Sequence, residues 1–153
     1  MQHKPSSNID FGNRPRIPER VLAYWRTHPA DAFDSRMRSD IGEWLRCLSA
    51  TSPEWRAAIG GDAACAIGMA LRLWPLRAIC PVVDMVMTIL LAAAFDDAAA
   101  ANVLAVALRK APIARRTRMK LSRSWLTRHS ILARRTVSGT RNVKSQKAPR
   151  RVS

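Results

Sequence analysis

Apolar residues recur every three or four positions along the middle of the chain, the spacing that places them on one side of an α-helix. The clearest stripe consists of Phe33, Met37, Ile41, Trp44, Leu45 and Leu48. No segment alternates apolar and polar residues over four to eight positions, as a half-buried strand would. The pattern therefore predicts an all-α protein, a compact bundle or short array of about six helices.

Residues that favour helix N-termini stand at several of the expected starts. Ser52 offers a capping hydroxyl, and Pro53 follows it at a position where the missing N–H of proline costs no hydrogen bond. Asp62 and Asp97 offer capping carboxylates to two later helices, and Pro81 suits the first turn of another. This agreement between caps and apolar stripes argues against a random reading frame.

These boundaries divide the chain into four segments. Residues 1–16 are polar, rich in Pro, Asn and Ser, and aperiodic, which predicts a disordered leader. Residues 17–111 are expected to form the helical core, and a basic helix is expected over residues 112–135. Residues 136–153 are basic and aperiodic, and we expect them to be a disordered tail.

Charge is distributed very unequally along the chain. Residues 1–108 contain 11 Lys and Arg against 11 Asp and Glu, whereas residues 109–153 contain 15 basic residues and no acidic one. The last 45 residues therefore carry the whole formal net charge of +15. This asymmetry is typical of an arm that binds nucleic acid, an anionic lipid surface or an acidic protein. Codon bias of a GC-rich coding sequence is an alternative source of part of the arginine.

Basic and apolar residues of the last predicted helix separate onto opposite sides, at about 100° per residue. The apolar side holds Leu121, Trp125 and Leu132. We expect this side to pack on the core while the other side contacts phosphates. The residues assigned to phosphate contact are Arg115, Arg116, Arg118, Lys120, Arg123, Arg134 and Arg135. No nucleic-acid-binding motif is present, so the predicted binding is electrostatic and does not distinguish RNA from DNA.

A membrane-spanning interpretation rests on the 18 mostly apolar residues from Ala78 to Phe95. Asp84 within this segment costs about 3 kcal/mol in a bilayer and nearly cancels the gain from strongly apolar residues at about −0.5 kcal/mol each. The carboxylate lies one turn after Pro81, where the helix dipole favours it. A buried core helix is therefore expected, and attachment of the basic arm to an anionic membrane surface is an alternative.

Residues for catalysis or metal binding do not group together in the sequence. Neither His28 nor His129 has a second ligand at metal-binding spacing, and the same holds for His3 in the leader. Asp96 and Asp97 are adjacent, so they point to different faces of a helix, which favours capping over paired acid–base chemistry. We therefore predict a protein that is not an enzyme and that uses neither metal nor cofactor.

The cysteines and the N-terminus favour a cytoplasmic location. The cysteines are odd in number, form no C-x-x-C pair and lie in apolar segments; they are Cys47, Cys65 and Cys80. We expect them to be reduced, buried and unreactive. The first residues contain no apolar stretch of the kind that a secretory signal requires.

Two hypotheses of function follow from these features. The first is a non-enzymatic helical scaffold whose basic C-terminal arm binds nucleic acid electrostatically. The second is a protein-interaction module that uses the helical core, with the arm acting at an anionic membrane surface or only as a solubility tail.

Overall fold

A computed structural model describes residues 17–48 and 52–145, with side chains described as far as residue 139. Within these ranges the chain forms eight helices and no strand, which confirms the all-α class and exceeds the predicted number of helices. The helices are α1 (Glu19–Leu22), α2 (Tyr24–Thr27), α3 (Ser35–Arg46), α4 (Pro53–Ile59), α5 (Ala63–Arg72), α6 (Pro81–Ala94), α7 (Ala98–Lys110) and α8 (Arg115–Ser145). The predicted leader over residues 1–16 and the last eight residues of the predicted tail lie outside the described residues.

The predicted helix caps are confirmed. Ser52, Asp62 and Asp97 each accept a hydrogen bond from the backbone N–H three residues later, at 3.3, 2.9 and 2.8 Å. These N–H groups have no carbonyl partner within their helices, and each cap contributes about 1 kcal/mol. Asp34 caps α3 in the same way, at 2.8 Å from the Met37 nitrogen, a cap that the apolar pattern did not reveal.

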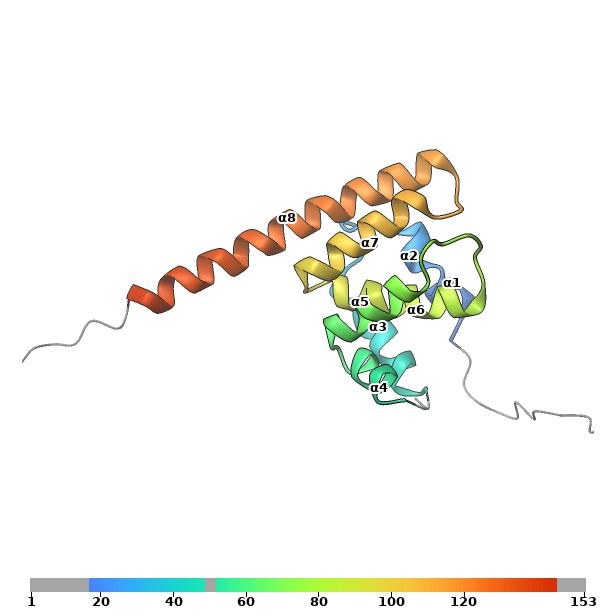
Figure 1. Ribbon diagram of the computed structural model, residues 1–153, viewed down its shortest axis with the longest axis horizontal. Coiled ribbons are helices and arrows are strands. Elements are labelled where there is room, and N and C mark those ends of the chain that lie inside the picture. Colours follow the sequence, from blue (N-terminus) through green and yellow to red (C-terminus); the bar gives the residue numbers. More distant parts are fainter. Residues whose placement is uncertain (1–16, 49–51, 146–153) are drawn as a thin grey trace, which may run out of the picture.

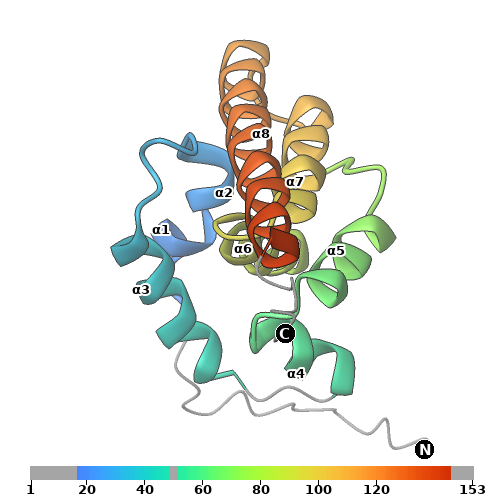
Figure 2. The ribbon, with the colours of Figure 1, turned by 90° about the vertical axis from the view of Figure 1, so that its left-hand side faces the viewer.

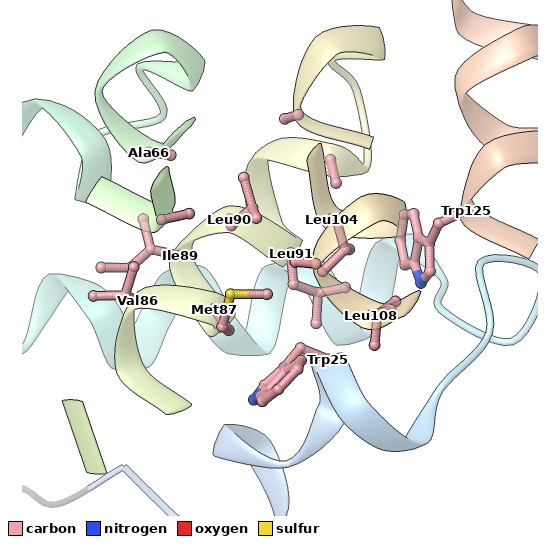
Figure 3. Close-up of a cluster of buried hydrophobic side chains, with 14 of the residues drawn as sticks. Trp25, Ala66, Val86, Met87, Ile89, Leu90, Leu91, Leu104, Leu108 and Trp125 are labelled. Atoms are coloured by element: carbon pink, nitrogen blue, oxygen red, sulfur yellow. The ribbon is translucent and has the colours of Figure 1, made fainter. Parts of the chain in front are cut away.

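Helix α6 forms the centre of the core. Figure 2 shows α3 on one side of α6 and α4 and α5 on the other, and eight of its 14 residues are buried. Leu90 and Leu91 of α6 pack with Leu104 and Leu108 of α7 (Figure 3). Burying each such side chain contributes about 1.5–3 kcal/mol. The apolar segment 78–95 therefore contains a core helix, as predicted.

The membrane-spanning interpretation finds no candidate among the helices. In the ranges 17–48 and 52–145, none combines the length and the apolarity that crossing a bilayer would require.

Asp84 ties the N-terminal helices to α6. Its carboxylate accepts hydrogen bonds from the indole Nε1 of Trp25 at 2.8 Å and from the guanidinium of Arg26 at 3.2 and 3.3 Å. The Asp84 side chain is only 13% exposed, so solvent screens these interactions weakly. The sequence predicted only that Asp84 interacts favourably with the dipole of α6. The structure shows that Asp84 also joins α2 to α6.

Substitution of Asp84 tests this link. Asp84→Ala leaves the buried Trp25 indole N–H and the Arg26 guanidinium without their acceptor, which is expected to lower the free energy of unfolding in urea by about 3 kcal/mol. Asp84→Asn retains an acceptor for the indole and is expected to lower it less. The control Asp40→Ala, at an exposed position of α3, is expected to stay within about 0.5 kcal/mol of the native protein. Equal stability of Asp84→Ala and Asp40→Ala would show that the link does not contribute.

Candidate nucleic-acid interface

Helix α8 runs antiparallel to α7 and then continues past it (Figure 1). The Ser122 hydroxyl donates to the carbonyl oxygen of Ala105 at 2.8 Å, and Nδ1 of His129 lies 2.8 Å from the carbonyl oxygen of Ala98, the first residue of α7. With 31 residues, α8 is about 46 Å long at 1.5 Å per residue. We call residues 115–132 its docked half and residues 133–145 its free half.

The docked half belongs to the hydrophobic core. Leu121, Trp125 and Leu132 are buried, as expected from their spacing, and the Trp125 ring lies 6.0 Å from the ring of Phe33, centroid to centroid. The core therefore does not end at residue 111, where we expected it to end, because the apolar face of α8 completes it. A truncation at Lys110 would expose this surface.

Arg128 of α8 closes the C-terminal end of α6. Its Nε donates to the carbonyl oxygen of Phe95 at 3.1 Å, and its guanidinium carbon lies 4.6 Å from the centre of the Phe95 ring. A cation is favoured at a helix C-terminus, where carbonyl groups lack N–H partners, and over an aromatic face. Arg128 therefore holds α8 on the body and is not among the residues free to meet phosphate.

Six of the seven residues assigned to phosphate contact have exposed side chains: Arg115, Arg116, Lys120, Arg123, Arg134 and Arg135. Arg118 is the exception, because it is half-buried and its buried Nε has no hydrogen-bond partner among the described residues. Arg118 lies seven residues before Trp125, which is nearly two full turns, so both point to the docked side. Helical spacing could have excluded Arg118 from the phosphate face.

The free half corrects the predicted boundary of disorder. Residues 136–145, which we expected to be disordered, continue α8 as a helix to Ser145. The basic, aperiodic composition suggested disorder there, but no proline interrupts the chain between Arg115 and Ser145. A helix already nucleated on α7 adds one hydrogen bond per residue as it extends, so no new nucleus is needed.

The positive charge of α8 is not compensated by the body. The helix contains ten Lys and Arg residues and no acidic residue. Ion pairs found among the described residues join Arg26 to Asp84, Arg38 to Asp96 and Arg72 to Glu54, and their basic members all belong to the body. The body therefore neutralises its own charges and leaves those of α8 to solvent or to a partner.

Among the described residues, neither a cleft nor a group of metal-ligating side chains forms a second candidate site as well supported as the basic surface of α8. An open cleft of about 570 Å³ lies among α3, the α4–α5 turn and the α6–α7 turn, and its Arg38 is paired with Asp96 at 2.8 Å. Within residues 17–48 and 52–145, no group of three His, Cys, Asp or Glu side chains could hold a metal ion. The described fold brings no set of catalytic groups together around His28 or His129. The His28 ring bonds to the Thr27 hydroxyl, and the His129 ring bonds to the backbone carbonyl of Ala98.

The cysteines are free thiols, but their expected burial is wrong for two of them. Cys47 and Cys80 are exposed because they lie at helix ends, as the C-cap of α3 and the N-cap of α6. Cys65 is half-buried, and burial followed by the neighbouring Asp62 carboxylate raises the pKa of its thiol. The Cys65 thiol therefore stays protonated, which makes it a poor nucleophile.

Substitution of Trp125 tests the docking of α8. Trp125→Ala removes a fully buried ring and is expected to lower the free energy of unfolding by about 3–5 kcal/mol. Trp125→Phe is expected to lower it much less, because it keeps most of the apolar contact and removes an indole N–H that has no hydrogen-bond partner among the described residues. Urea unfolding of both variants checks this order, and equal destabilisation by the two would contradict the docked arrangement.

Comparison with known proteins supplies no relative from which to infer a function. No protein-family model matches the chain, and neither a curated protein nor a solved structure shows a significant match.

Proposed function

We propose that this protein is a non-enzymatic helical scaffold that binds nucleic acid electrostatically through the outer surface of α8. The observation that carries the proposal is a row of exposed basic side chains on a helix whose opposite face is packed into the core. Arg116, Lys120, Arg123 and Arg134 form this basic row. A cytoplasmic location, as predicted from the sequence, gives such a surface access to RNA and DNA.

The spacing of the basic row suits an extended polyanion. Arg116 and Arg123 are seven residues apart, about 10 Å along the axis, and Arg134 follows after a further 11 residues, about 16 Å. Seven and 11 residues are close to two and three turns, so the three guanidinium groups emerge on one side. Because packing on α7 already orders the docked half, binding requires little further ordering of its backbone. Neutralising several phosphates releases condensed counterions, which supplies the driving force.

Attachment to a lipid surface is less well supported. A helix that lies in a membrane interface inserts an apolar face between the lipid head groups. The apolar face of the docked half is already used, because Leu121, Trp125 and Leu132 are buried against the body. Trp125, which would be the natural interfacial anchor, has no exposed surface.

Removal of charge from the docked half tests the proposal. The triple variant Arg116→Gln, Lys120→Gln and Arg123→Gln is expected to bind labelled duplex DNA and single strands more weakly, measured by fluorescence anisotropy across a salt series. Removing one phosphate neutralisation reduces the slope of log affinity against log salt by about 0.9 on duplex DNA, so a reduction of about 2.7 is expected for three.

A control variant that loses the same number of positive charges keeps this test specific. The variant Arg36→Gln, Arg56→Gln and Arg77→Gln removes three exposed arginines from the body and is expected to keep the native slope. Equal weakening in both variants would indicate a general charge effect without a defined face. If the native protein binds anionic vesicles but no nucleic acid at low salt, the proposal is wrong.

A further inference from the structure

Among the described residues, no other helix packs against α8 beyond Leu132 (Figure 1). Leu132 is the last buried residue of α8 among those whose side chains are described, and residues 134–139 are all exposed. Figure 1 shows the helix continuing away from the body beyond the start of α7. The 13 residues of the free half extend about 20 Å at 1.5 Å per residue.

This segment lacks the features that normally stabilise an isolated helix. It has no acidic residue, so no ion pair of opposite charges can form along it. Thr136, Val137, Ser138 and Gly139 all have lower helix propensity than alanine. Among the exposed side chains from 134 to 139, only Val137 is a large apolar one, so no apolar stripe is available to pack on a protein surface or on lipid. What the segment offers a partner is positive charge on a slender helix.

We propose that the free half of α8 inserts into the major groove of duplex DNA. This inference rests on the proposed nucleic-acid binding and names its substrate class. An α-helix with side chains is about 10–12 Å across, and the major groove of B-DNA is about 12 Å wide. At about 3.4 Å per base step, a helix 20 Å long spans about six base pairs.

The positions of the basic residues fit a groove bounded by two phosphate backbones. Arg134 continues the line of the basic row, whereas Arg135 projects about 100° away from it. The two guanidinium groups therefore diverge toward opposite walls of a groove that contains the helix axis. The small side chains of Ser138 and Gly139, one turn further on, allow the helix backbone to approach the base edges closely.

Other nucleic acids fit this helix less well. The major groove of A-form RNA is deep and narrow and does not admit side chains for reading bases, so a duplex RNA would contact the basic row but not enclose the free half. Single strands have no groove to receive a helix. Duplex DNA is therefore the nucleic acid that engages both halves of α8.

The test compares the full-length protein with Val137→Pro, which interrupts the helix in the free half and leaves the charge unchanged. Val137→Ala is the matched control, because it keeps the helix. Position 137 is exposed and lies outside the core, so urea unfolding should show both variants folded like the native protein. Binding to a DNA duplex and to an RNA duplex of the same sequence is measured, and dimethyl sulfate then probes guanine N7 in the major groove and adenine N3 in the minor groove.

The native protein and Val137→Ala are expected to bind the DNA duplex about tenfold more tightly than the RNA duplex and to protect guanine N7 but not adenine N3. Val137→Pro is expected to lose the preference and the protection while keeping salt-dependent binding through the docked half. Equal binding of DNA and RNA duplexes by the native protein, or protection that Val137→Pro retains, would overturn groove insertion and leave the proposed function standing. Absence of binding to either duplex at low salt would overturn both.

Discussion

Packing of the apolar face of α8 against α7 and Phe33 is the interaction on which the rest of the account depends. It buries Leu121, Trp125 and Leu132, and it thereby fixes which side of the helix faces solvent. Because the basic row lies opposite that face, hydrophobic burial on one side organises charge on the other. The same packing ends at Leu132, near the N-terminal end of α7, so the position where α7 begins determines where α8 becomes free.

Charged side chains hold α6 at both of its ends, each with the sign that the helix dipole favours. Near the N-terminus, the Asp84 carboxylate binds Trp25 and Arg26 and so attaches α2. At the C-terminus, the guanidinium of Arg128 binds the Phe95 carbonyl and so attaches α8. The central helix therefore joins the N-terminal elements to the basic helix, and the position of α8 depends on the same core as the remainder of the body.

Residue type and helical period predicted much of this fold. They could not predict contacts between residues that lie far apart in the sequence. The caps at Ser52, Asp62 and Asp97 and the buried face of α8 follow from residue type and helical period, which are properties of neighbouring residues. The partners of Asp84 lie 58 and 59 residues away, and no pattern in one sequence specifies them. Arg118 was assigned to phosphate contact from charge alone, although its period places it on the docked side. The extension of α8 beyond residue 135 was missed because disorder was predicted from a basic, aperiodic composition. Composition does not show that a helix already packed on α7 can extend without a new nucleus.

The central claim is that α8 is one helix with a docked half and a free half, the second of which engages DNA. Amide hydrogen exchange of the full chain, alone and with duplex DNA, tests it most directly, because exchange reports local opening residue by residue. Amides of residues 119–132 should exchange as slowly as those of α6 in both conditions. Amides of residues 134–145 should exchange quickly in the free protein and slowly with DNA. Rapid exchange throughout α8, or a free half that DNA leaves unchanged, would contradict the account.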